Sequence, residues 1–424
     1  MKAYFDEYAA LLKRELLPAL GCTEPTAIAY AAALARECLG AFPERVVVAC
    51  SHDVIKNTMS VRVPMAGELH GIEAAALMGL IGGDPKRGME VLSAADGDTR
   101  LRARELLGTG LCRVEQLEAA EALAIRVTAW AGEHSAVAEI RGKHDHIARL
   151  ERDGRSLCAQ EETRDEARRP SPAYPEMDLE RILDYAEEAD LAPVAPVLER
   201  QVEYNLRIAE EGLKNPWGAC VGRTLLQNYG DDVKNVARAW PAAGSDARMS
   251  GCVLPVVINS GSGNQGLTAS LPVVKYAEYC HAPYERLLRA LALSNLVAIY
   301  QKSQLGTLSA FCGAVCAAAG SGAGIAFLLD GRREVIRQTI VNTLADVSGI
   351  ICDGAKPSCA AKIASAVDAA ILGFSLAREQ HGFTEGEGIV QSTADETCHM
   401  AMKIGREGMR ETDRVILDVM LARR

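Results

Sequence analysis

The chain has 424 residues, of which 49% are hydrophobic and only 5% aromatic, and its formal net charge is -10. The length exceeds that of one typical compact domain, and the abundance of Ala and Gly favours closely packed helices over a β-sandwich. Acidic and basic residues are mixed with no basic tract, which argues against nucleic acid or an anionic membrane as a partner and favours a small molecule.

Two helices joined by an elbow are predicted at the start of the chain. Apolar residues recur at helical spacing over 4–39, and GCTEP (21–25) breaks the pattern. Thr23 suits an N-cap and Pro25 suits the first turn, so Cys22 is expected beside a helix N-terminus. A thiol there can have a lowered pKa and act as a base or nucleophile, although a cysteine packed at a helix elbow is the simpler interpretation.

Segments rich in β-branched residues dominate from residue 45 to about 158, and their alternation with helical patterns predicts a mixed α/β layer domain over 1–160. Strands are predicted at 45–51, 59–64, 123–130, 135–142 and 146–154, and helices at 71–81 and 99–108. The charged, proline-containing segment 161–178 is the predicted linker.

Helical patterns, many of them rich in Ala, replace the strands after the linker, and 179–424 is predicted to be an all-helical domain that carries the catalytic site. The expected helices lie at 179–213, 285–302, 307–329, 333–349, 356–371 and 390–421. The fold class is therefore α+β, with a mixed α/β N-terminal domain followed by a mainly all-α C-terminal domain.

The cysteine usage predicts a reduced, cytoplasmic protein. Thirteen is an odd number, and the amphipathic start lacks the apolar core of a signal peptide, so a disulfide framework is not expected. The longest apolar stretches are interrupted by glycine and are shorter than a membrane-spanning helix. Most of the thiols are expected to pack as small hydrophobic side chains.

One cysteine pair lies in a polar, loop-like segment, ICDGAKPSC (351–359). Gly354 follows an Asp in a turn and Pro357 can open a helix, so Cys352 and Cys359 could converge beside a helix N-terminus. Zinc prefers shorter pairs and four protein ligands, whereas an iron–sulfur cluster tolerates irregular spacing. On spacing alone, inert thiols remain the simplest interpretation, with a metal or cluster as the alternative.

A glycine-rich segment, SGSGNQGLTAS (260–270), is the second candidate. Gly263 permits close backbone approach, and Ser262, Asn264 and Gln265 supply hydrogen-bonding groups. The segment predicts either a nest for a carboxylate at a helix start or a tight interhelical turn. It is not a P-loop, because Gly-Lys-Ser/Thr is missing.

The histidines carry little signal in the sequence. His144 and His146 flank Asp145 and are predicted to lie in a solvated polar turn, with a metal site as the alternative. His134, in GEHS, is likewise predicted to be a solvated turn residue, with a substrate site as the alternative.

Five sequence segments occur in a fixed order along the chain. Each segment alone is a weak signal of family membership, but the five together are a specific one. They are GCTEP (21–25), IKNTMSVRVP (55–64), GDPKRGMEVL (83–92), SGSGNQGLTASLPV (260–273) and ICDGAKPSCAAKI (351–363). The combination resembles the L-cysteine desulfidase family, which is related to the α subunit of iron–sulfur L-serine dehydratases. The resemblance covers nearly the whole chain.

This resemblance implies a [4Fe-4S] enzyme that splits L-cysteine into hydrogen sulfide, ammonia and pyruvate without pyridoxal phosphate. Three cysteines ligate the cluster in that family, and the matching positions are Cys312, Cys352 and Cys359. Cys316, one helical turn after Cys312, competes for the first position. The proton-abstracting cysteine of the family maps onto Cys22.

Residue type suggests the remaining roles within this hypothesis. Glu24 would pair with the substrate ammonium or orient Cys22. Candidates for holding the substrate carboxylate or ammonium are Asn57, Ser262, Gly263, Asn264 and Gln265.

Three alternatives stay open. An L-serine dehydratase would perform the same elimination with hydroxide as the leaving group. A non-catalytic iron–sulfur redox protein would keep the three cluster cysteines without needing Cys22. A pyridoxal-phosphate lyase would need a Schiff-base lysine, and Lys302 and Lys356 are available without a compelling context. The expected partner is a small amino-acid substrate, and a homodimer is the default oligomeric state.

Overall fold

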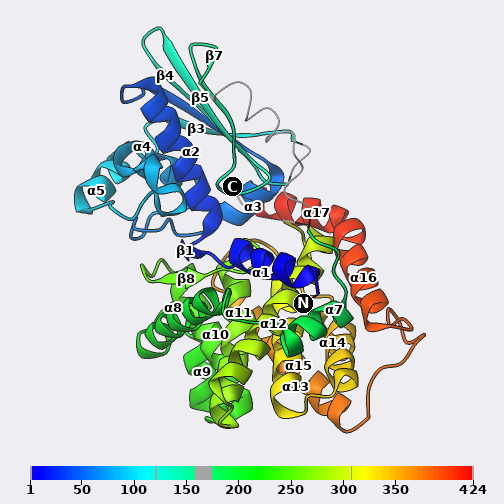
Figure 1. Ribbon diagram of the computed structural model, residues 1–424. Helices are drawn as coiled ribbons and strands as arrows, with labels where there is room; N and C mark the ends of the chain where they lie inside the picture. Colours follow the sequence, from blue (N-terminus) through cyan, green and yellow to red (C-terminus); the bar gives the residue numbers. More distant parts are fainter. Residues whose placement is uncertain (1, 120–121, 158–173, 307, 423–424) are drawn as a thin grey trace.

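The computed structural model describes residues 2–119, 122–157, 174–306 and 308–422, and the structural statements below refer to these residues. The chain forms a sheet lobe and a helical lobe, with the sheet lobe above the helical lobe in Figure 1. This arrangement confirms the predicted α+β fold class.

The two predicted helices at the start are present, with a short strand in the elbow between them. Gly21 has a φ of +58°, and a Cβ atom there would overlap the ring of Pro64, so the turn requires glycine. Cys22 is the N-cap residue of the second helix, one position before the predicted Thr23. The elements are α1 (Tyr4–Glu15), β1 (Pro18–Leu20) and α2 (Thr23–Leu39).

The sheet lobe is built on a six-stranded sheet with the order β3-β2-β4-β5-β6-β7, in which only the β2 and β3 pair is parallel. Val46 and Val48 alternate with less buried neighbours and join the same apolar cluster as α2, which lies against the sheet. The elements are β2 (Arg45–Cys50), α3 (His52–Thr58), α4 (Gly71–Gly82), η1 (Pro85–Glu90), α5 (Gly97–Leu106), β3 (Cys112–Gln116), β4 (Ala124–Ala131), β5 (His134–Arg141), β6 (Ile147–Arg152) and β7 (Arg155–Ser156).

The predicted strand at 59–64 is wrong, and β3 is absent from the prediction. Val61 and Val63 are buried, so the alternation at 59–64 is real, but the backbone turns and forms only an isolated bridge from Arg62 to His70. β3 lies at the sheet edge with Cys112 as its single buried residue, so it has no alternation to detect.

The helical lobe contains the remaining helices and one short strand, β8, which pairs with β1 in an antiparallel two-stranded sheet. Its elements are α7 (Leu179–Glu188), α8 (Ala195–Lys214), α9 (Val221–Tyr229), α10 (Val233–Met249), β8 (Pro255–Val257), α11 (Gly263–Tyr279), α12 (Tyr284–Leu305), α13 (Gly313–Leu329), α14 (Arg333–Val347), α15 (Cys359–Arg378), α16 (Ala394–Lys403), η2 (Ile404–Gly408) and α17 (Arg410–Leu421).

Several of the predicted helices have different boundaries in the structure. The predicted helix at 179–213 is divided into α7 and α8 by a connection that contains Pro193. The helix predicted from 307 begins at Gly313, and the one predicted over 390–421 is divided into α16, η2 and α17.

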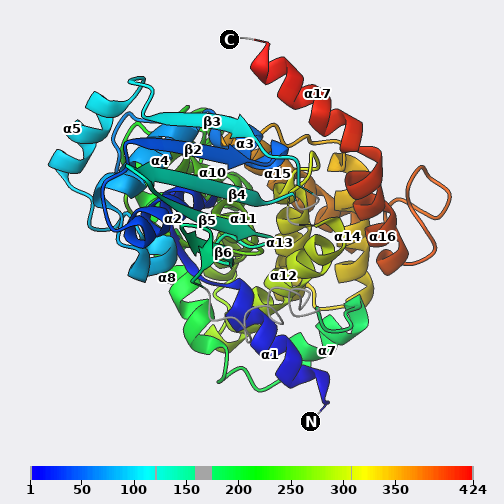
Figure 2. The ribbon, with the colours of Figure 1, turned by 90° about the horizontal axis from the view of Figure 1, so that it is seen from above.

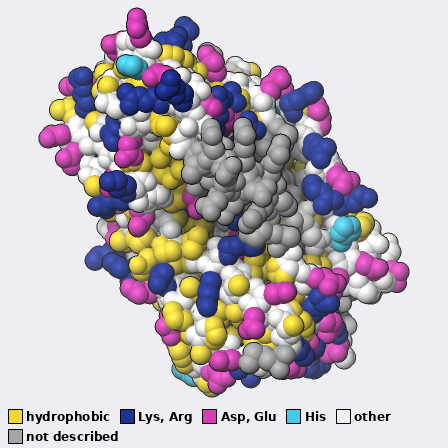
Figure 3. Space-filling view, turned by 45° about the horizontal axis from the view of Figure 1, so that its top comes forward, with side chains coloured by type: hydrophobic (Ala, Val, Ile, Leu, Met, Phe, Trp, Pro, Cys, Tyr) yellow, Lys and Arg dark blue, Asp and Glu magenta, His cyan; other side chains and the backbone are white. Residues whose placement is uncertain are grey.

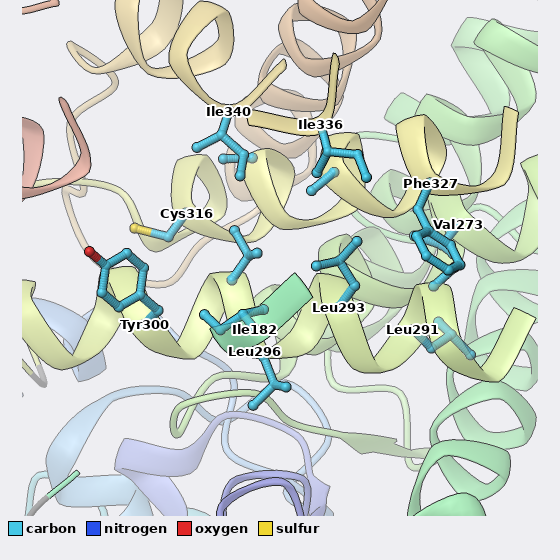
Figure 4. Packing of buried hydrophobic residues seen from close by; sticks show 14 of the residues in the cluster. Ile182, Val273, Leu291, Leu293, Leu296, Tyr300, Cys316, Phe327, Ile336 and Ile340 are labelled. Carbon is cyan, nitrogen blue, oxygen red and sulfur yellow. The ribbon is translucent and has the colours of Figure 1, made fainter. Parts of the chain in front are cut away.

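Small side chains allow the central helices to pack closely, as the composition predicts. Gly320 of α13 lies so near α12 that a Cβ atom there would overlap the carbonyl oxygen of Ser294. Figure 4 shows the apolar side chains between these helices, including Leu293 and Ile336, within the main buried cluster. The core of the helical lobe is therefore dense and rigid.

Both ends of the chain connect the two lobes. α1 packs into the apolar cluster of the helical lobe, through Phe5 and Tyr8 among others. α17 returns from the helical lobe to contact α3, and Figure 2 shows it extending beside the sheet lobe. The boundaries at 160 and 178 stay a prediction, and most of the predicted linker lies outside the described residues.

One described helix, α15, has the length and apolar composition that could cross a membrane. It packs against α10, α13 and α14, which is typical of a core helix in a globular protein. On the face shown in Figure 3, basic and acidic side chains are interspersed among the described residues.

Candidate active site

A cavity of about 110 Å³ lies where the two lobes meet, and thiols, polar side chains and backbone turns line it. It is bordered by the start of α2, the turn after β5, the start of α11 and the loops before α13 and α15. Of the predicted site residues, all but Gly263 line it: Cys22, Glu24, Asn57, Ser262, Asn264, Gln265, Cys312, Cys352 and Cys359.

Backbone pairing brings the distant cysteine segments together. The Cys312 N–H donates to the carbonyl of Ile350 at 3.0 Å, and the Cys352 N–H donates to the carbonyl of Ala310 at 2.6 Å. Phe311 thereby forms a β-bridge to the segment forty residues later. Two loops that the sequence separates therefore present their thiols to one cavity.

A glycine in the second cysteine loop permits close contact between the two lobes. Gly354 has a φ of +91°, and a Cβ atom there would overlap the carbonyl oxygen of Lys56 in α3. This close approach brings Asn57, the next residue of α3, to the wall of the cavity beside Cys352.

Cys22 belongs to a buried hydrogen-bond cluster centred on Glu24. The Cys22 thiol and the Thr23 hydroxyl each donate to Glu24 Oε2 at 3.1 Å. The Asn57 amide donates to Glu24 Oε1, also at 3.1 Å. The predicted role of Glu24 in orienting Cys22 agrees with this geometry.

The expected lowering of the Cys22 pKa is wrong for the protein without ligands. Burial raises the pKa of the Cys22 thiol well above its ordinary value of 9.0, and the adjacent Glu24 carboxylate adds to this, while Arg248 acts in the opposite direction. Burial also opposes ionisation of Glu24, yet His144, the thiol and Arg248 together hold the pKa of Glu24 below its usual range. The resting site therefore has a neutral thiol that donates to a carboxylate.

Arg248 is a site residue that the sequence analysis did not find. It lies in the last turn of α10, is 4% exposed, and donates from Nη1 to Asn264 Oδ1 at 3.2 Å. Its Nε has no hydrogen-bond partner among the described residues. The only signal in the sequence is an arginine near the end of an Ala-rich helix, twelve residues before the start of the glycine-rich segment.

Gly263 serves the site indirectly. It does not line the cavity, and a Cβ atom there would overlap the Arg248 guanidinium and come within 2.7 Å of Val256 Cγ2. The absence of a side chain at Gly263 thus leaves the space that Arg248 fills.

His144 lies in the site, and its prediction as a solvated turn residue is wrong. Its side chain is 12% exposed, and its Nε2 lies 4.0 Å from Glu24 Oε1. The turn between β5 and β6 faces the other lobe, and Gly261 packs against the imidazole. His134, by contrast, is exposed as predicted, and its ring bonds to Asp153 at 2.9 Å.

The two cysteines that compete for the first position of the proposed cluster occupy different surroundings. Cys312 is the N-cap residue of α13 and lines the cavity. Cys316 lies in the core near Tyr300 in Figure 4, and its sulfur is 3.7 Å from that of Met402. Only Cys312 is therefore placed to share a ligand with Cys352 and Cys359.

The family model described as the serine dehydratase alpha chain matches residues 74–418. The chain belongs to the serine dehydratase alpha chain family. A UPF0597 protein from Lachnoclostridium phytofermentans is 53% identical over 97% of this chain and 98% of its own length. A UPF0597 protein from Desulfitobacterium hafniense is 44% identical over 99% of this chain and 97% of its own length.

Cys312, Cys352 and Cys359 place three thiols on one cavity, and cysteine thiolates are the usual ligands of iron–sulfur clusters. In the described parts of the chain, no group of three or more His, Cys, Asp or Glu side chains is arranged to hold one metal ion. A four-iron cluster binds each cysteine at a different iron, so its ligands stand further apart. Burial and the neighbouring thiols of Cys352 and Cys359 raise the pKa of Cys312, and burial raises the pKa of Cys359, so a cationic partner would favour the thiolate forms of Cys312 and Cys359.

Proposed function

We propose that the protein is a [4Fe-4S]-dependent L-cysteine desulfidase, which converts L-cysteine to hydrogen sulfide, ammonia and pyruvate by β-elimination with Cys22 as the proton-abstracting base. One observation carries this proposal: Cys22 and the thiols of Cys312, Cys352 and Cys359 line the same cavity, although three separate segments supply them. Membership in the serine dehydratase alpha chain family supports a lyase of this kind.

Cys312, Cys352 and Cys359 would hold the cluster. An iron without a protein ligand supplies Lewis-acid assistance to the carboxylate and the leaving thiolate of the substrate.

The cavity offers groups of both signs for a zwitterionic amino acid. Arg248 Nε and the N-terminal N–H groups of α11 are donors that match a carboxylate. Asn57 Oδ1 and Gln265 Oε1 are buried acceptors without a hydrogen-bond partner among the described residues, and Glu24 carries negative charge. These acceptors match a substrate ammonium group.

Cys22 removes the α-proton of the substrate as a thiolate. The C–S bond of the substrate then breaks, and the resulting aminoacrylate tautomerises to an imine that water hydrolyses to pyruvate and ammonia. Cys22 is 3% exposed, so bulk water does not compete for it.

L-Serine dehydratase activity is the second candidate, because the matching family model bears that name. The two substrates differ only in the leaving group, and iron binds sulfur more readily than a hydroxyl, which favours L-cysteine. A non-catalytic redox protein would not need Glu24 and Asn57 arranged around Cys22.

The test uses protein purified without oxygen. We expect iron and sulfide in the protein and faster pyruvate formation from L-cysteine than from L-serine. Faster turnover of L-serine would overturn the choice of substrate, and absence of iron and sulfide would overturn the cluster.

Variants separate the assigned roles. Cys22→Ser is expected to keep its iron and lose elimination, whereas Cys352→Ser loses iron as well. Cys280→Ser is the matched control, because Cys280 is half-buried and does not line the cavity. Elimination by Cys22→Ser at the wild-type rate would show that another residue is the base.

We further propose that the enzyme is soluble and cytoplasmic, acts as a homodimer, and has neither nucleic acid nor a membrane as a partner.

A further inference from the structure

A buried histidine faces the carboxylate that holds Cys22, and the reaction proposed above gives it no role. His144 Nε2 has no hydrogen-bond partner among the described residues and lies 4.0 Å from Glu24 Oε1. The other oxygen of the same carboxylate accepts the hydrogen bond of the Cys22 thiol. Glu24 therefore lies between a thiol that must lose a proton and an imidazole nitrogen free to accept one.

We propose that His144 accepts the proton of the Cys22 thiol by way of Glu24, which converts Cys22 into the thiolate base. This inference rests on the proposed elimination. The S–H bond of Cys22 breaks as Glu24 Oε2 takes the proton. Rotation of the protonated carboxyl group then turns this O–H toward His144, and the O–H bond breaks as His144 Nε2 takes the proton. The products are a thiolate, the original carboxylate and an imidazolium, so charge and protons balance without another reactant.

In the resting site the thiol holds the proton and the imidazole nitrogen does not, while the raised pKa of Cys22 and the lowered pKa of His144 both oppose the transfer. Burial lowers the pKa of His144 below 6.5, although Glu24 and Asp145 raise it, so the imidazole is neutral at neutral pH. A neutral imidazole is a proton acceptor. Hydrogen bonds of catalytic groups are often long before substrate binds, so the 4.0 Å separation is compatible with a relay.

The charges around the relay stabilise its product. The groups that face it are Glu24 from α2, Arg248 from α10 and Asp145 beside His144. An imidazolium at His144 would face the Glu24 carboxylate, and a thiolate at Cys22 would gain the attraction of Arg248 and of the α2 N-terminus. Each charge thus arises next to a group of opposite sign, while Glu24 repels the thiolate and Arg248 repels the imidazolium.

The relay lies where the lobes meet, because His144 comes from the turn after β5 in the sheet lobe and Arg248, which acts on His144, comes from the helical lobe. Gly261, at the start of the glycine-rich segment, lies beside the imidazole, because a Cβ atom added there would be 3.6 Å from His144 Cε1. The position of His144, and hence the supply of thiolate, depends on how the sheet lobe lies on the helical lobe.

The test measures Cys22 directly as well as catalysis. Cluster-loaded protein is treated with iodoacetamide between pH 5 and 9.5, and alkylation of Cys22 is followed by peptide mass spectrometry. We expect His144→Gln to react about tenfold more slowly at pH 7.5 and its midpoint to rise by about one pH unit or more. Its kcat falls by about 100-fold with little change in KM, which is the scale of general base catalysis.

His146→Gln is the matched control, because His146 lies in the same turn, does not line the cavity, and bonds through Nδ1 to the Arg141 carbonyl at 3.0 Å. It is expected to behave as wild type. Identical Cys22 alkylation profiles in both variants would overturn the relay, as would a rise in KM for His144→Gln without a changed alkylation profile.

Two further outcomes are distinguishable. If wild type forms pyruvate from neither L-cysteine nor L-serine, the proposed function fails while the alkylation profile still tests the relay. If His144→Gln does not fold, His144→Asn takes its place, and an alkylation profile of Cys22 identical to that of wild type overturns the relay.

Discussion

Around Cys22, the chemistry of each side chain depends on atoms from other segments of the chain. The thiol at a helix N-terminus would be acidic in isolation, but burial and Glu24 reverse that tendency. Arg248 supplies a guanidinium group to the cavity and His144 supplies an imidazole. Neither residue lies in the five segments that carry the family resemblance. The contacts of individual side chains therefore determine the chemistry of the site, and the sequence motifs alone do not.

Arg248→Gln is expected to weaken substrate binding. The loss of a charge-assisted carboxylate contact raises KM for L-cysteine by about 10- to 100-fold with little effect on kcat, because such a bond contributes about 1.5–3 kcal/mol. Steady-state kinetics measures this, with Arg207→Gln on the exposed face of α8 as the control. A fall in kcat at unchanged KM would contradict the carboxylate assignment.

Gly263→Ala should have the same effect without removing a charge. The added methyl group takes the space of the Arg248 guanidinium, so KM rises in the same direction and the iron content stays at the wild-type level. Gly349→Ala is the control, because a Cβ atom there meets nothing within 4 Å. Wild-type kinetics in Gly263→Ala would show that Arg248 does not need its present position.

At the scale of elements, turns and caps position the site more than the regular structures do. The elbow before α2, the bridge between the loops before α13 and α15, and the approach of Gly354 to α3 each depend on backbone geometry. α9 and α10 show the same principle away from the cavity. Asp246 of α10 accepts the Gly222 N–H of α9 at 3.2 Å while fully buried.

Asp246 predicts a pH dependence of stability. Burial raises the pKa of its carboxyl from 3.8 to about 6, although backbone N–H groups near Gly222 oppose the shift. A raised folded-state pKa means that the stabilising contribution is complete below pH 3.8 and is lost as the pH rises through about 6. The free energy of unfolding should therefore fall by about 2–3 kcal/mol between pH 4 and 7 from this group alone.

Asp246→Asn isolates that contribution, since an amide mimics the protonated carboxyl at all pH values. Urea denaturation at pH 5 and pH 7.5 should show a smaller difference for the variant than for wild type. An equal difference in both proteins would show that Asp246 does not titrate in this range.

At the scale of the whole molecule, a buried ion pair anchors the end of the chain to the sheet lobe. Lys56 of α3, with a side chain 1% exposed, donates to Asp413 of α17 and to Asp53 at 3.2 Å. Lys56 is also the residue whose carbonyl meets Gly354. The contact between α3 and α17 therefore supports the lobe junction on which the cavity lies.

Asp413→Ala is expected to destabilise the protein by about 3 kcal/mol, because it leaves a buried ammonium with Asp53 as its remaining carboxylate partner. We expect a lower midpoint of thermal unfolding and a faster loss of iron from the variant than from wild type. Asp418→Ala, on the exposed side of α17, should be neutral. Equal midpoints for the two variants would contradict a structural role for the buried pair.

Much of the architecture was predictable, because local patterns carry it. Helical periodicity located α1, α2 and most helices of the second half, and β-branched alternation located β2, β4, β5 and β6. The strand predicted at 59–64 was wrong because its buried and exposed residues alternate within a turn. β3 was not predicted because its buried and exposed residues do not alternate.

The sequence by itself determined which thiols and polar side chains are available, since the cysteines and the glycine-rich segment carry recognisable spacing. Tertiary structure alone decided that His144 is buried, that Arg248 reaches the cavity, that Cys316 lies in the core, and that Cys22 is a neutral thiol. The physical reason is that burial and the electrostatic field at a group depend on all segments that surround it, and here those segments come from two lobes.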